Sequence, residues 1–171
     1  MIVESEGYKI DFKDALNAFK FDETDKNKSN YHGVTALKAV DIIAEFEDKY
    51  VFVEIKKYDN SDELVDSFNF IAGGTIPRHK YFSWLKNYLK SKFRDSFLYR
   101  YAENKVDRPI HYICLLNFDN ALNVELSKSL RRELPLNKPS ERWVHILSKS
   151  CNVVNLKKWN EVFTNWPAVE I

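Results

Sequence analysis

The chain has 171 residues, of which 44% are hydrophobic and 15% are aromatic. A chain of this length and composition can bury one substantial core, which excludes a disordered protein and predicts a single domain over residues 1–171. The formal net charge of +1 indicates no particular class of partner. The sequence has no run of ~18 apolar residues that could span a membrane, no secretion-signal pattern at its beginning, and only two cysteines. We therefore expect a soluble, cytoplasmic protein with no membrane partner.

Periodic patterns predict a succession of helices and strands. Apolar residues three and four positions apart indicate helices, and short runs rich in Val, Ile and Phe indicate strands. In chain order, the expected elements are a helix over 11–21, a polar loop over 22–34, two strands within 40–58, a helix within 60–74, a helix over 79–102, a strand over 108–118, a helix over 121–134, short strands over 142–148 and 151–156, and a helix over 156–166. Since both hairpin and helical crossover connections occur in this order, we expect an α/β fold with a mixed β-sheet flanked by helices.

The two strands within 40–58, VDIIAEFEDKYVFVEIKKY, gather charged residues at one end. Side chains alternate between the two faces of a strand, so the number of residues in the turn decides which sets share a face. With a two- or four-residue turn, the apolar face would hold Val40, Ile42, Ala44, Phe46, Val51, Val53 and Ile55. The opposite face would hold Asp41, Ile43, Glu45, Phe52, Glu54 and Lys56. Asp41, Glu54 and Lys56 would then lie near one another at the end away from the turn.

These three side chains suit a metal site. Asp41 and Glu54 would bind a hard divalent cation such as Mg²⁺, with the carbonyl oxygen of Ile55 as a further ligand. Such an ion polarises a phosphoryl oxygen and lowers the pKa of a bound water, and Lys56 would orient that water or neutralise charge on the phosphate. The same residues also fit ordinary ion pairs on the surface of an antiparallel hairpin, so both interpretations stay open.

Asp41, followed by Glu54-Ile55-Lys56 on the next strand, resembles the motif of the PD-(D/E)XK nuclease superfamily. Asp41 matches the first acid of the motif, Glu54 the second acid and Lys56 the lysine. The resemblance implies a restriction-endonuclease-like core in which these residues use Mg²⁺ or Mn²⁺ to hydrolyse phosphodiester bonds. Val40 stands where the motif has proline, which carries no catalytic group. The family often adds an acid from the first helix, and four candidates stay open here: Glu4, Glu6, Asp11 and Asp14.

Positive charge is concentrated in residues 78–100, RHKYFSWLKNYLKSKFRDSFLYR, where Asp95 is the single acid. Lys86, Lys90 and Arg94 recur every four residues and would form one ridge along a helix that could follow a phosphate backbone. The interleaved aromatic residues could stack on unpaired bases. The candidate nucleic-acid-binding residues are Arg78, Lys80, Lys86, Lys90 and Arg94. A solvated basic helix with aromatic residues packed beneath it is the alternative interpretation.

Together these features favour a metal-dependent DNA endonuclease, and a homodimer would suit cutting of both strands. One alternative is a catalytically inactive module on the same fold that binds nucleic acid or another protein. A second alternative is an unrelated fold in which the hairpin is an ordinary sheet edge.

Overall fold

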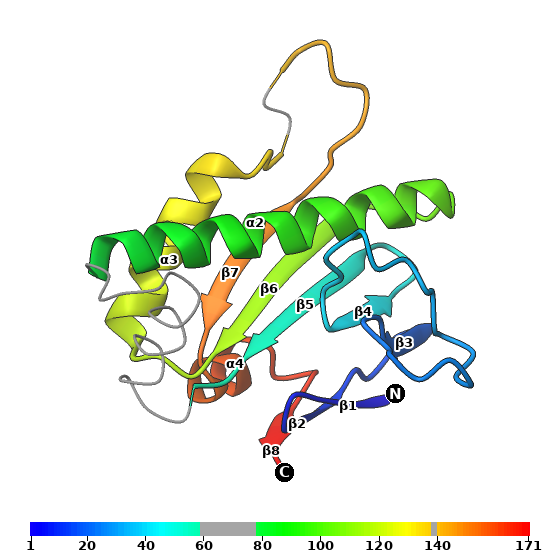
Figure 1. Ribbon diagram of the computed structural model, residues 1–171, viewed down its shortest axis with the longest axis horizontal. Helices are drawn as coiled ribbons and strands as arrows, with labels where there is room; N and C mark the ends of the chain where they lie inside the picture. Colours follow the sequence, from blue (N-terminus) through cyan, green and yellow to red (C-terminus); the bar gives the residue numbers. More distant parts are fainter. Residues whose placement is uncertain (59–77, 138–139) are drawn as a thin grey trace.

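The computed structural model describes residues 1–58, 78–137 and 140–171 (Figure 1), without the side chains of residues 78 and 79. Its centre is a five-stranded mixed sheet with the strand order β3-β4-β5-β6-β7. β3 (Asn17–Lys20), β4 (Ile42–Glu45) and β5 (Tyr50–Lys56) form an antiparallel meander, and β6 (Ile110–Leu116) and β7 (Ser150–Val154) continue the sheet parallel to β5. The mixed sheet expected from the connections is therefore confirmed.

Two long helices cover one face of this sheet. α2 (Arg78–Ala102) connects β5 to β6 and runs across the strands, and α3 (Asn120–Glu133) connects β6 to β7 (Figure 1). Buried apolar residues of both helices pack with Ile43, Phe52 and Tyr112 of the sheet. β5, β6 and β7 run parallel because a helical crossover returns the chain to the same end of the sheet before each new strand begins.

A second, smaller sheet and a short helix cover the opposite face. β1 (Ile2–Ser5), β2 (Tyr8–Asp11) and β8 (Ala168–Glu170) form an antiparallel sheet in the order β1-β2-β8, and α4 (Leu156–Val162) lies beside it. Ile10 and Trp159 are fully buried against the side chains of the large sheet. The β5 strand is thus covered on both faces, which explains its almost continuous apolar sequence.

Several predicted elements differ from the observed ones. The helix expected over 11–21 is wrong, because residues up to Asp11 pair with β1 and residues 17–20 pair with β4. The helical spacing of Phe12, Leu16 and Phe19 does not mark one buried face: Phe12 is buried beside the small sheet, whereas Leu16 is 62% exposed.

Near the C-terminus, the strand expected over 142–148 is also wrong. The segment contributes a single isolated bridge, from Ser148 to Leu136, and Val144 is 86% exposed. The last helix ends at Val162 rather than at residue 166. The helices over 79–102 and 121–134 and the strands over 108–118 and 151–156 are confirmed within a few residues. The helix expected within 60–74 lies outside the described residues. None of the described helices is long and apolar enough to cross a membrane.

Candidate metal centre

The β4–β5 hairpin has the parity expected from the sequence. Ile43 pairs with Phe52 and Glu45 with Tyr50, which leaves a four-residue turn over 46–49. This register brings residue 41 opposite residue 54, two positions before Lys56. Val40 differs from the expectation, because β4 begins only at Ile42: its side chain packs in the core under α2, and not with the opposite apolar face.

Asp41 and Glu54 are both buried at the end of the hairpin away from the turn. Asp41 is 3% exposed and Glu54 is 1% exposed. One Asp41 carboxylate oxygen accepts a hydrogen bond from the backbone N–H of Ile55, which fixes the aspartate against β5. Aspartate and glutamate are almost never fully buried unless they are paired. Asp41 and Glu54 therefore differ from ordinary charged residues at a protein surface.

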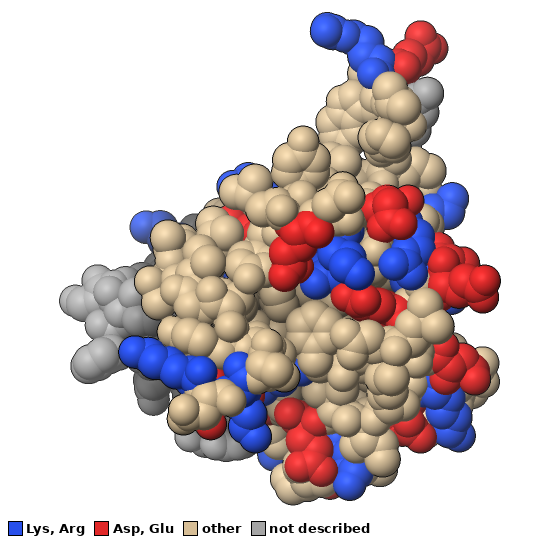
Figure 2. Space-filling model, turned by 90° about the vertical axis from the view of Figure 1, so that its right-hand side faces the viewer, with Lys and Arg blue, Asp and Glu red and all other residues tan. Residues whose placement is uncertain are grey.

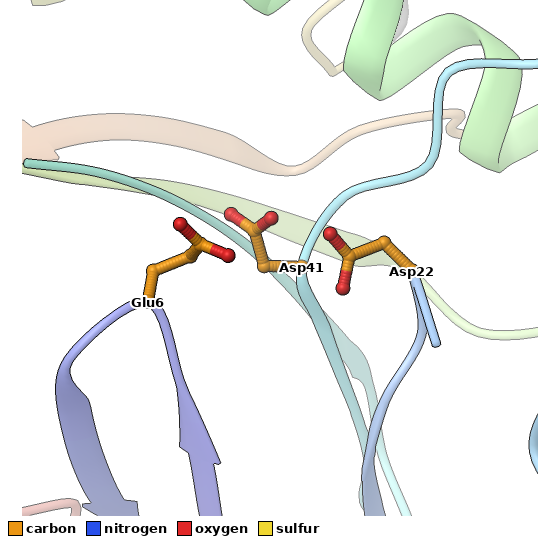
Figure 3. Close-up of side chains that lie close together, drawn as sticks. All are labelled: Glu6, Asp22 and Asp41. Atoms are coloured by element: carbon orange, nitrogen blue, oxygen red, sulfur yellow. The ribbon is translucent and has the colours of Figure 1, made fainter. Parts of the chain in front are cut away.

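Two further acids approach Asp41 from outside the motif (Figure 3). The backbone N–H of Phe21 donates to the carbonyl oxygen of Asp41 at 2.7 Å, and Asp22 follows immediately. Glu6 lies at the tip of the β1–β2 hairpin. Carboxylate oxygens of Glu6, Asp22 and Asp41 lie within 4.8 Å of one another, and Figure 3 shows Glu6 and Asp22 on either side of Asp41. Three carboxylates at this separation can bind one hard divalent cation.

The turn that carries Glu6 has an uncommon backbone conformation. Glu6 has φ 50° and Gly7 has φ 76°, the left-handed values of a two-residue turn that favours Asn-Gly. Glutamate is an unfavourable residue at the first of these positions. The two-residue hairpin turn thus holds Glu6 in this conformation beside the other carboxylates.

Among the residues that the structure describes, Lys92 of α2 is the cation that pairs with both buried acids. Its Nζ lies 3.2 Å from Glu54 Oε2 and 3.7 Å from Asp41 Oδ1, and its side chain is 11% exposed. Neither Glu54 oxygen accepts a hydrogen bond of good geometry from the described residues. The single positive charge of Lys92 therefore offsets only part of the charge of the two carboxylates, and the Glu54 oxygens can still bind another ligand.

Burial changes the acid–base properties of this group. It raises the pKa of Glu54 to about 7, even though the Lys92 ammonium acts in the opposite direction. Burial, and then the negative charge of Glu54, raise the pKa of Asp41 well above its usual range. Burial alone would lower the pKa of Lys92, but Glu54 and Asp41 raise it above its usual value. Excess negative charge in a poorly hydrated site is the condition under which a divalent cation binds well.

The other residues predicted for the site have different surroundings. Lys56 points to the α2 side, with its Nζ 6.0 Å from the centre of the Tyr88 ring. Ile55 contributes its N–H to Asp41, and its side chain is buried in the opposite core. Of the N-terminal acids left open by the sequence, Glu6 belongs to the acidic cluster, and Asp11 instead forms an ion pair with the amino group of Met1.

Asp22 and Lys92 are not among the residues that the sequence predicted for this site. Lys92 lies three residues after Leu89 and seven after Leu85, so it shares the buried face of α2, which is an informative position for a lysine. Asp22 directly follows the FKF segment, but its proximity to Asp41 depends on the pairing of β3 with β4.

The basic segment of α2 is partly neutralised by α3. Lys86 and Lys90 both form ion pairs with Glu133, whereas Lys80 and Arg94 are exposed. The Arg78 side chain lies outside the described residues. On the face of the molecule that Figure 2 shows, acidic and basic side chains are interspersed.

Comparison of the chain with protein-family models, with curated proteins and with solved structures found no match. The interpretation of the site therefore rests on its own geometry and charges.

Proposed function

We propose that the protein is a metal-dependent phosphodiesterase that acts on nucleic acid, with DNA as the substrate that the PD-(D/E)XK resemblance implies. The observation that carries the proposal is the burial of Asp41 and Glu54 side by side, with Asp22 and Glu6 adjoining them. An antiparallel meander followed by a helix and a parallel strand is also compatible with the mixed sheet of that superfamily. A restriction-endonuclease-like fold is therefore part of the proposal.

The residues present fit a hard divalent cation, Mg²⁺ or Mn²⁺. All the side-chain donors are carboxylate oxygens, the ligands that both ions accept, and Glu54 retains unused acceptor capacity. Asp41 and Asp22 would hold the ion, with Glu6 closing the site from the small sheet and Glu54 binding the ion or its water. When bound, the ion would supply a water of lowered pKa and polarise the scissile phosphate.

The protein's own cations would have separate tasks. Lys92 offsets part of the negative charge of Glu54 and Asp41 and so favours their ionised forms in a buried site. Lys56, one strand position beyond Ile55, would face the phosphate and neutralise the charge that develops there. Lys92 would thus act on the metal-binding carboxylates, and Lys56 on the phosphate of the substrate.

The test is Mn²⁺ binding measured by calorimetry, together with nicking of supercoiled plasmid. We expect Asp41→Asn and Glu54→Gln to weaken Mn²⁺ binding by at least about tenfold, or ~1.4 kcal/mol. Nicking should fall by roughly 100-fold or more, because several kcal/mol of transition-state stabilisation depend on the ion. Glu4→Gln is the matched control, since Glu4 lies in the same β1–β2 hairpin as Glu6 but pairs with Lys9 at the surface. Undiminished Mn²⁺ binding in both site variants would refute the metal centre.

A second candidate function is favoured by the position of Lys92. Its ammonium already pairs with both buried acids, as expected in a catalytically inactive module that keeps the fold and binds nucleic acid or protein. The same titration separates the two functions, because the inactive module would not bind Mn²⁺ at the acidic cluster.

A further inference from the structure

Three lysines lie around one aromatic ring, beside the acidic centre formed by Glu6, Asp22, Asp41 and Glu54. The Nζ atoms of Lys38, Lys92 and Lys56 lie 5.4, 5.5 and 6.0 Å from the centre of the Tyr88 ring. The three residues come from different parts of the chain: the segment before β4, helix α2 and the end of β5. Because Lys92 also contacts Glu54 and Asp41, this basic cluster directly adjoins the carboxylates.

Lys38 is held in this position by α2. Its backbone N–H donates to Asp95 Oδ2 at 2.9 Å, and the backbone N–H of Val40 donates to the buried Ser96 Oγ at 2.9 Å. Asp95, the single acid of the basic segment, thus anchors the chain next to the three lysines. Tyr88, Lys92 and the Asp95–Ser96 pair are spaced by about one helical turn each, so they lie along one side of α2.

The three lysines differ in how many carboxylate oxygens lie near their ammonium groups. Lys92 has two carboxylate oxygens within 4.0 Å, whereas within the described ranges neither Lys38 nor Lys56 has one at that distance. The Lys38 and Lys56 ammonium groups lie 5.4 and 6.0 Å from the same ring centre, so their like charges raise the local positive potential, which the ring offsets only in part. An anion bound between them would lower this potential, and a phosphate is the anion that the adjoining metal centre would process.

We propose that Lys38 and Lys56 form a phosphate-binding subsite against the Tyr88 ring, and that it takes a backbone phosphate of a nucleic acid strand lying across the acidic centre. The inference rests on the proposed function for the identity of its ligand. It assigns a role to Lys38, which the PD-(D/E)XK motif does not include. It also places substrate contacts at the C-terminal end of β5 and the middle of α2, beside the scissile position.

The subsite is tested without catalysis, by the binding of a fluorescent single-stranded oligonucleotide in EDTA over a series of salt concentrations. On a single strand, each lost phosphate contact reduces the slope of log affinity against log salt by about 0.7. We expect Lys38→Met to weaken binding several-fold and to lower the slope by about this amount, and Lys38→Arg to retain both. The double variant with Lys56→Met should lower the slope by about 1.4.

Lys26→Met is the matched control, because Lys26 is an exposed lysine of the same segment between β3 and β4. An equal loss of slope in Lys26→Met and Lys38→Met would overturn the subsite, since general charge alone would then explain it. Unchanged binding in Lys38→Met would overturn it as well. Inorganic phosphate should displace the oligonucleotide better than chloride of equal ionic strength, because it would compete for the same subsite, and equal displacement by the two salts would overturn the proposal.

Mn²⁺ calorimetry on the same variants distinguishes the two proposals. Intact Mn²⁺ binding with no effect of Lys38→Met refutes the subsite and leaves the metal centre standing. Absent Mn²⁺ binding in the wild-type protein, with a reduced salt slope in Lys38→Met, refutes the metal centre and supports the phosphate subsite.

Discussion

Replacing Lys92 by methionine should destabilise the protein strongly, and more at alkaline than at acidic pH. Methionine keeps most of the side-chain volume but removes the charge that lies 3.2 Å from Glu54 and 3.7 Å from Asp41. At an effective dielectric constant of about 20, these two separations correspond to attractions of about 5 and about 4.5 kcal/mol. Desolvation of the buried ammonium offsets much of this gain, and removal of one partner of a buried ion pair costs ~3–5 kcal/mol in practice.

The pH dependence follows from the carboxyl groups that remain. In the variant, Glu54 and Asp41 can avoid the cost of unpaired burial by binding protons, which happens more readily at pH 5 than at pH 8. We therefore expect the full loss at pH 8 and a clearly smaller loss at pH 5. For a domain of this size, ~3 kcal/mol lowers Tm by roughly 6–12 °C.

The measurement is thermal and urea unfolding of the metal-free protein in EDTA at both pH values. Lys90→Met is the control on the same helix, because Lys90 pairs with Glu133 near the surface and should cost no more than about 1 kcal/mol at either pH. A loss of stability in Lys92→Met no larger than in Lys90→Met would show that the Lys92 charge does not stabilise the buried acids. A loss as large at pH 5 as at pH 8 would show that protonation of Glu54 and Asp41 does not relieve their unpaired burial.

Two further predictions concern Glu54 and Glu6. Burial raises the pKa of Glu54 to about 7 from an ordinary 4.5, so its contribution to stability is fully present below about pH 4.5 and is lost as the pH rises through 7. Urea unfolding in EDTA should show this decline in the wild-type protein and a flatter profile in Glu54→Gln; parallel profiles would contradict it. Glu6→Asn should stabilise the metal-free protein by about 1 kcal/mol, because an Asn-Gly pair suits the left-handed turn. The same substitution should weaken Mn²⁺ binding, and calorimetry that shows unchanged affinity would remove Glu6 from the metal centre.

The β4–β5 hairpin was predictable because its information is local. The alternation of Ile43 with Glu45 and of Phe52 with Glu54 defines two faces, and only an even turn keeps the apolar set together. The mixed sheet followed from the connections, since the segment between β5 and β6 is long enough for a helical crossover and the β4–β5 turn is not. These inferences need no knowledge of which segments meet in space.

The N-terminal third of the chain was not predictable in the same way. Phe12, Leu16 and Phe19 have a helical spacing, yet Phe12 and Leu16 lie in the connection between β2 and β3, and Phe19 lies in β3. The strand conformation of β2 depends in part on its pairing with β8, which lies near the other end of the chain. Short strands carry a weak local pattern, and their stability comes from partners that are distant in sequence.

The sequence by itself determined the hairpin, its two faces and the proximity of Asp41 to Glu54, because each of these depends on neighbours along one short stretch. The tertiary structure decided the rest of the acidic centre: β3 pairing brings Asp22, the small sheet brings Glu6, and packing of α2 brings Lys92 and Tyr88. Ion–ligand and ion-pair contacts act over a few ångströms in space, whereas sequence patterns report the environment of each segment and not which distant side chains will meet.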